Sequence, residues 1–127
     1  MAHLDIRYTL PHVRLQIPFE KMAHGALPTN YQLSLVICGD RLAQRMNAEY
    51  RKKTYKPNVL SFSLSKTEGE IFLNVRKAER EARNRGMSVR AHLAHLFVHG
   101  CLHLDGHKHG TAMESLEEKI LRKFTFR

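Results

Sequence analysis

Histidine is concentrated in one short stretch of this 127-residue chain. The segment HGCLHLDGHKHG, residues 99–110, contains four of its nine histidines: His99, His103, His107 and His109. His99 and His103 are four residues apart, so on a helix their imidazoles lie one above the other, close enough to share a zinc ion. After a turn at Gly106 the chain can return and offer a third nitrogen, from either His107 or His109. This spacing predicts a metal site with three histidine ligands.

Three protein ligands leave the fourth tetrahedral position of a zinc ion open to water. The metal lowers the pKa of such a water toward about 7, which makes hydroxide available at neutral pH. A structural zinc is usually closed by a fourth ligand, often cysteine, and Cys101 is expected on the opposite side of the helix. Zincin metalloproteases also use HxxxH, but their general base is a Glu directly after the first His, where this chain has Gly100. The pattern therefore favours a hydrolytic metal site without the peptidase base.

The helix that must carry these ligands is predicted over residues 89–104, with Ser88 as its N-cap. Its histidines, at positions 92, 95, 99 and 103, fall within about 80° of one another at 100° per residue. The remaining faces are apolar, so we expect a central and largely buried helix. The alternative to a metal site is a row of histidines that only make hydrogen bonds in the core.

The other elements are predicted from apolar periodicity and turn residues. Strands are expected at residues 31–38, 58–64 and 70–75, the last two as a hairpin, with an opening strand at either 6–10 or 13–17. Helices are expected at 18–27, 41–53 with Asp40 as N-cap, 76–86 and 112–124. The pattern indicates an α+β fold, a mixed α/β layer, in a single domain over residues 1–127.

The chain is strongly basic, with 21 Lys and Arg against 12 Asp and Glu and a net charge of +9. A small basic protein most often binds a polyanion, and nucleic acid is the commonest one. The alternative is that the charge serves only solubility. No apolar run approaches the roughly 18 residues of a membrane span, and the N-terminus has no signal-peptide pattern, so we expect a cytoplasmic protein with no membrane partner and with reduced cysteines.

Four segments of the chain resemble, in order, the motifs of one bacterial family. The histidine segment HGCLHLDGHKH is similar to HGxLHLxGYDH of the YbeY family, the metal-dependent endoribonucleases also called rRNA maturation factors. Residues 46–62, MNAEYRKKTYKPNVLSF, resemble that family's LNxxYRxxxxPTDVLSF. GEI at 69–71 resembles its GDI hairpin, and MESLEEKIL at 113–121 resembles its closing MxxxExxIL helix.

The resemblance implies which residues form the site. The metal ligands fall on His99, His103 and His109, which selects His109 over His107, and one Zn²⁺ per chain is expected, although imidazole sites also accept other divalent transition metals. Arg51 takes the place of a family arginine that serves the RNA phosphate. Lys52 and Lys53 follow it as expected RNA-backbone contacts, with solvated surface lysines as the alternative.

The resemblance also implies the fold and the function. We expect a small, mostly parallel four-stranded sheet, with one antiparallel strand, packed around the histidine helix in a zinc-hydrolase-like fold. The expected activity is metal-dependent hydrolysis of single-stranded RNA in ribosomal RNA maturation and ribosome quality control, with the ribosome or small-subunit proteins as partners. Two alternatives are a metal-dependent hydrolase of peptides or small molecules, and a non-catalytic RNA- or ribosome-binding protein stabilised by its metal. His107-Lys108 stands where the family has Tyr-Asp.

Overall fold

The computed structural model describes residues 2–124 and contains four strands and five helices over that range. The strands are β1 (His3–Tyr8), β2 (Gln32–Cys38), β3 (Val59–Ser65) and β4 (Glu68–Asn74). The helices are α1 (Phe19–Ala26), α2 (Asp40–Arg51), α3 (Val75–Arg85), α4 (Val89–Leu104) and α5 (Thr111–Leu121).

The four strands form one sheet in the order β1-β2-β4-β3. β1 and β4 both pair with β2 in parallel, whereas β3 pairs with β4 in antiparallel fashion. The central strand β2 reads QLSLVIC and is buried along most of its length, as expected of a parallel strand covered on both faces. The predicted mixed fold, with a mostly parallel four-stranded sheet, is confirmed.

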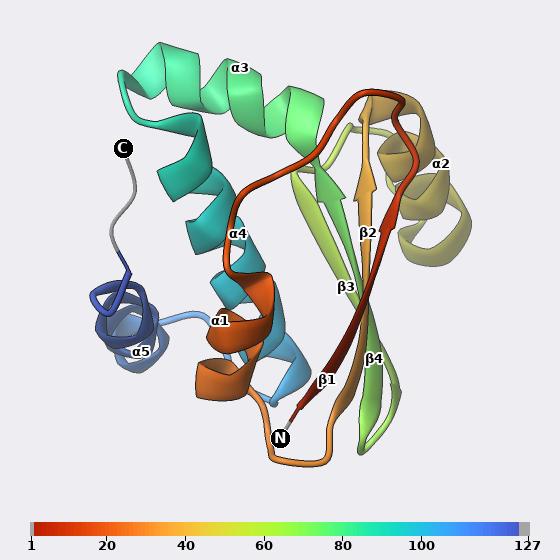
Figure 1. Cartoon of the computed structure of the whole chain (residues 1–127). Coiled ribbons are helices and arrows are strands. Elements are labelled where there is room, and N and C mark those ends of the chain that lie inside the picture. The colour runs from red at the N-terminus through yellow and green to blue at the C-terminus, as the bar shows by residue number, and fades with distance from the viewer. Residues whose placement is uncertain (1, 125–127) are drawn as a thin grey trace.

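Helix α4 lies at the centre of the main apolar core. Figure 1 shows α4 beside the sheet with α1 and α5 near it, and α2 on the opposite face of the sheet. Leu93, Phe97, Val98 and Cys101 of α4 are fully buried, so the helix is apolar nearly all round except for its histidine row. No helix of the described chain has both the length and the apolar character that crossing a bilayer requires.

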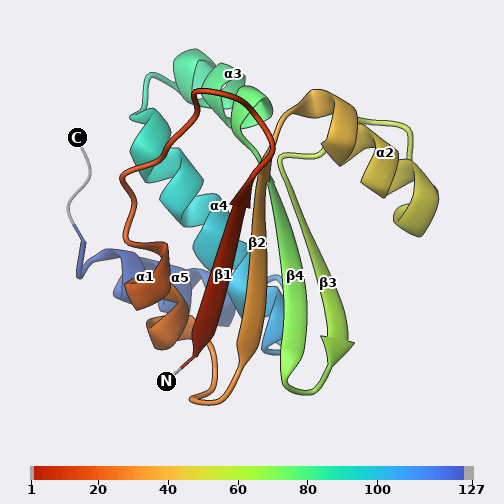
Figure 2. The same cartoon turned by 45° about the vertical axis from the view of Figure 1, so that its right-hand side comes forward.

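A glycine allows α4 to pack closely against strand β3. A methyl group added at Gly100 would lie 2.9 Å from Oγ of Ser61 and 3.2 Å from Cδ1 of Ile71. The Ser61 hydroxyl donates a hydrogen bond to the Gly100 carbonyl oxygen at 3.2 Å. The absence of a side chain at this position therefore brings the histidine row of α4 alongside β3, which is one of the two edge strands of the sheet (Figure 2).

The structure differs from the sequence prediction in several element bounds, and most clearly in the opening strand and at the N-cap of α2. The opening strand is the first candidate and begins three residues earlier, at His3, because β1 pairs with β2 from His3 opposite Gln32 onward, and residues 13–17 form no strand. Asp40 is not the N-cap of α2. Gly39 occupies that position, and the Asp40 carboxylate instead accepts two hydrogen bonds from Arg80, each 2.8 Å long.

Candidate metal centre and the adjoining cleft

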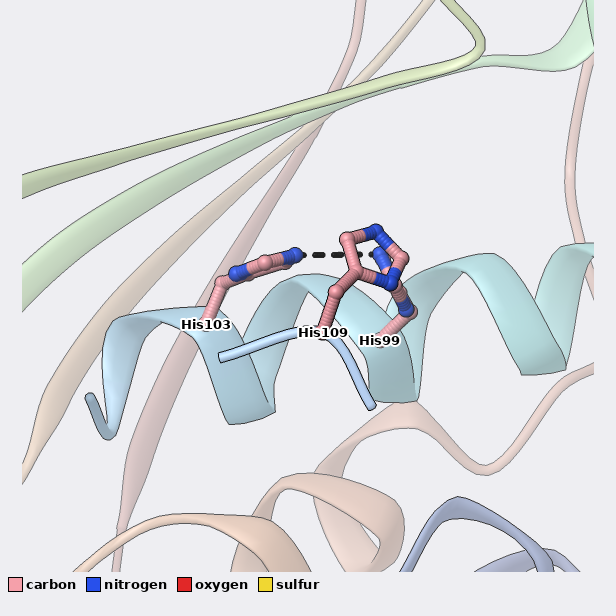
Figure 3. A group of neighbouring side chains, drawn as sticks. All are labelled: His99, His103 and His109. Atoms are coloured by element: carbon pink, nitrogen blue, oxygen red, sulfur yellow. Dashed lines mark hydrogen bonds between the residues drawn. The ribbon is translucent and has the colours of Figure 1, made fainter. Parts of the chain in front are cut away.

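Three histidines converge at the C-terminal end of α4. His99 and His103 project from α4, and His109 reaches back from the loop that follows it (Figure 3). One ring nitrogen of each lies within 4.8 Å of the others, and Nε2 of His99 is 3.1 Å from Nε2 of His103. Two nitrogens bound tetrahedrally to zinc lie about 3.3 Å apart, so this donor set and its spacing fit a zinc ion.

His107 is not part of this cluster. Its Nε2 lies 3.3 Å from the Asp105 carboxylate, within the turn that follows α4. Gly106 adopts a positive φ of 89° in the same turn, a backbone conformation that glycine reaches without strain. The turn therefore directs His107 toward Asp105, and the return of the chain brings His109 to the two helical ligands, as the motif resemblance predicted.

The surroundings of His103 favour the neutral form of its imidazole, which is the form that binds a cation. Burial lowers the pKa of the His103 imidazole, and the facing rings of His99 and His109 lower it further. A neutral imidazole has a free lone pair, which a metal ion requires of its ligand.

A buried carboxylate from α5 orients one of the ligands. Oε2 of Glu117 accepts a hydrogen bond from Nδ1 of His99 at 2.6 Å, and Glu117 is only 5% exposed. With its proton on Nδ1, His99 presents the lone pair of Nε2 to His103 and His109. Oε1 of Glu117 lies 3.4 Å from Nε2 of His95, which is a half-exposed residue rather than a core one. Carboxylates placed in this way commonly fix the tautomer and ring angle of a metal-binding histidine.

Glu117 was not singled out by the sequence analysis. The MESLEEKIL segment could have pointed to it, because the match of this segment to the family motif includes this glutamate. What the sequence could not show is that α5 packs against α4 with Glu117 facing His99, since eighteen residues separate the two side chains along the chain.

Arg51 lies across a cleft from the histidines. One of its terminal nitrogens donates a hydrogen bond to the backbone oxygen of Ser61 on β3, and its guanidinium carbon lies 5.0 Å from the centre of the Phe62 ring. These contacts hold the end of α2 against β3, and Arg51 lines the same cleft of about 730 Å³ as the three histidines. Lys53 also lines this cleft, whereas Lys52 is exposed and does not.

A second cavity adjoins the triad, and its charged residues are three glutamates and one arginine, Arg122. It has a volume of about 620 Å³ between α4 and α5, and Glu114, Glu117 and Glu118 contribute to its wall. His99 and His109 line both cavities. The candidate metal centre therefore separates a cleft that contains cations from a cavity that contains carboxylates.

The fold and this site agree with the comparisons with known proteins. The family described as endoribonuclease YbeY matches residues 12–125, which is most of the chain. The chain belongs to the YbeY family. A protein of Laribacter hongkongensis named endoribonuclease YbeY is 42% identical over 109 residues, which cover 75% of this chain and 66% of that protein. A protein of the same name from Methylibium petroleiphilum is 35% identical over 130 residues, covering 94% and 87% of the two chains.

A solved structure shows the same fold. The solution structure of a protein from Thermotoga maritima aligns with a TM-score of 0.68 at 18% identity, covering 97% of this chain and 88% of that one. As a member of the YbeY family, the chain keeps the three histidines together despite the exchange of Tyr-Asp for His107-Lys108. Lys108 is exposed beside His109, so the exchange places a cation next to the candidate metal centre.

Proposed function

We propose that this chain is a metal-dependent endoribonuclease that hydrolyses single-stranded RNA. The observation that carries the proposal is the convergence of His99, His103 and His109 with Arg51 on one cleft. The relatives that bear the name endoribonuclease YbeY support an RNA substrate. Zinc suits three imidazole donors at this spacing, and other divalent transition metals can bind the same donors.

Each residue has a distinct part in this reaction. The three histidines would hold the metal, and Glu117 keeps His99 in the tautomer that offers Nε2 to it. When bound, a divalent metal supplies Lewis-acid activation of a water molecule and of a phosphoryl oxygen. Arg51 binds the phosphate and stabilises the negative charge that develops on it, because its planar fork matches two phosphate oxygens.

The charges around the site select the side from which RNA approaches. A phosphate chain is attracted to the cleft that contains Arg51 and Lys53 and is repelled by the glutamate-lined cavity on the other side. Lys52, which lies beside the cleft, adds to the attraction at longer range. A single strand can bend to bring one phosphate to the histidines, whereas an A-form duplex holds its phosphates on a stiff helix.

The biological substrate that fits this reading is ribosomal RNA during end maturation and ribosome quality control. The family description and the net charge of +9 support an RNA substrate. The motif resemblance implies that this RNA is ribosomal, with the ribosome or small-subunit proteins as partners in the cytoplasm.

The proposal is tested by cleavage of labelled single-stranded RNA, duplex RNA and an unstructured peptide by the purified, zinc-loaded protein. We expect cleavage of the single strand alone, and its loss on addition of a chelator. Arg51→Ala should keep the metal and the fold but lose most of the cleavage. Cleavage of the peptide with both RNAs intact would refute the nuclease proposal and indicate a hydrolase of another substrate class. Ribosome binding without cleavage would indicate a non-catalytic protein.

A further inference from the structure

The cleft continues well beyond the metal centre. His92 lines its far end and His99 its near end, and seven residues of helix place them about 10 Å apart along the axis of α4. Lys53 and Tyr55, from the loop after α2, and Arg85, from the end of α3, also line this cleft. A phosphate held between the histidines and Arg51 cannot also fill this far end, which leaves room for a second group of the same ligand.

The loop that carries Tyr55 is held in place by side chains of neighbouring elements. Gln44 donates to the backbone oxygen of Thr54 at 2.9 Å, and Asn47 donates to that of Tyr55 at 3.0 Å. Asn74 donates to the backbone oxygen of Pro57 at 3.0 Å. Although the backbone is fixed in this way, the Tyr55 side chain is 61% exposed. The fold thus presents an aromatic ring to the cleft that it does not need for its own core.

The polar groups at this end of the cleft complement a nucleotide. Lys53 and Arg85 are exposed cations, which can pair with a phosphate. Asn58 forms part of the wall, and its amide nitrogen donates to the Glu81 carboxylate at 3.0 and 3.3 Å, so its orientation is set by the protein. An exposed aromatic ring in the same cleft as cations and an oriented amide is a combination that proteins use to hold an unpaired base and its backbone.

We propose that Lys53, Tyr55 and Arg85 form a subsite for a nucleotide that neighbours the cleaved phosphate. Its base stacks on the Tyr55 ring, and the phosphates of the bound strand pair with Lys53 and Arg85. The inference rests on the proposed RNA-cleaving function and adds to it: the subsite binds only an unpaired base, because a base inside a duplex has no free face for stacking. It therefore supplies a part of the preference for single strands.

The chain offers a matched control for each member of the subsite. Tyr50 is 63% exposed, nearly as much as Tyr55, but its ring packs on Phe62 at 5.6 Å and does not line the cleft. In the same way Lys52 and Arg83 are exposed cations outside the cleft wall, near Lys53 and Arg85 in sequence. Each pair of variants changes charge or ring content equally, and the two members of a pair differ in their position relative to the cleft.

The experiment measures KM and kcat for a labelled single-stranded hexanucleotide with the zinc-loaded protein, and its affinity by fluorescence anisotropy in the presence of chelator. Tyr55→Leu should weaken binding and raise KM about five- to tenfold, in the lower part of the range expected for loss of one stacked base. Tyr55→Phe should retain wild-type binding because stacking needs only the ring. Lys53→Gln and Arg85→Gln should each weaken binding by more than Lys52→Gln and Arg83→Gln, and Tyr50→Leu should change it less than twofold.

Removing one base at a time from the hexanucleotide locates the stacked position. At a single abasic position the difference between wild type and Tyr55→Leu should vanish, and at the other positions it should persist. Equal binding by Tyr55→Leu and wild type, or equal losses in the subsite and control variants, would overturn the subsite while leaving the proposed cleavage intact. Tyr55-dependent binding without any cleavage would support the subsite and refute the nuclease. A wild-type protein that binds no RNA would refute both.

Discussion

The contact between Glu117 and His99 leads to a sharp expectation for metal affinity. Replacing Glu117 by Gln retains a hydrogen-bond acceptor for Nδ1 of His99 but removes the charge, and replacing it by Ala removes both. Because the carboxylate is 5% exposed and its bond to the imidazole is 2.6 Å long, water cannot easily substitute for it. Without it, His99 is free to rotate and to place its proton on Nε2, the nitrogen that faces the other two histidines.

The size of the effect follows from the kind of contact. A hydrogen bond to a charged group contributes roughly 1.5–3 kcal/mol, and loss of a carboxylate behind a metal-binding histidine typically lowers metal affinity about 10–100-fold. A 10–100-fold change corresponds to about 1.4–2.7 kcal/mol, so the two estimates agree. We therefore expect Glu117→Ala to bind zinc 10–100-fold more weakly than the wild type, and Glu117→Gln to lie between them.

The assay is competition for zinc against a chromophoric chelator, with circular dichroism to verify the fold of each variant. Glu118→Gln is the matched control, because it removes the same charge from the neighbouring position of α5. Its carboxylate is exposed and lies 3.3 Å from a terminal nitrogen of Arg122, and it makes no hydrogen bond to a histidine of the described chain. The control should bind zinc within about twofold of the wild type.

Two further measurements separate a positioning role from a merely structural one. Nitrogen NMR of the metal-free protein should show the proton of His99 on Nδ1 in the wild type and a mixture of tautomers in Glu117→Ala. Glu117→Asp should restore part of the zinc affinity, since it returns the charge. Wild-type zinc affinity in folded Glu117→Ala, or an equal loss in the Glu118 control, would show that this carboxylate does not position the ligand.

Other consequences of the structure can be measured independently. His107→Ala should retain about one zinc per chain in metal analysis, whereas His109→Ala should lose it. Gly100→Ala should lower the free energy of unfolding in urea by about 1–3 kcal/mol, because the added methyl would lie 2.9 Å from a β3 hydroxyl. Hydrogen bonds from Arg80 lower the pKa of the Asp40 carboxyl to about 2. The contribution of this carboxylate to folding stability is therefore present above its pKa in the unfolded chain, near 3.9, and is lost as pH falls through about 2. The acid-induced loss of stability in urea titrations should accordingly be smaller in Asp40→Asn. RNA affinity should fall as salt rises, with a slope near −0.7 per contacted phosphate.

Much of the candidate site could be predicted from the local spacing of residues in the sequence. His99 and His103 share a helix face because the α-helix repeats every 3.6 residues, and the apolar remainder of residues 89–104 places that helix in the core. The family motif selected His109, which the structure brings to the other two histidines. The hydrophobic runs similarly predicted the strands and the mixed fold, because burial of alternating or continuous apolar residues is a local property of the chain.

The tertiary structure decided the contacts between segments that are distant in sequence. Glu117 faces His99 only because α5 packs on α4, and Lys53 and Tyr55 line the cleft with Arg85 only because α2 packs on the sheet and α3 packs on α4. The spacing of residues along the chain does not predict such contacts, because each depends on how whole helices and strands pack against one another. Residue types and local spacing thus predicted a three-histidine metal site and the family motif selected His109, whereas the packing of helices on the sheet determined which side chains orient the candidate ligands and which form the cleft.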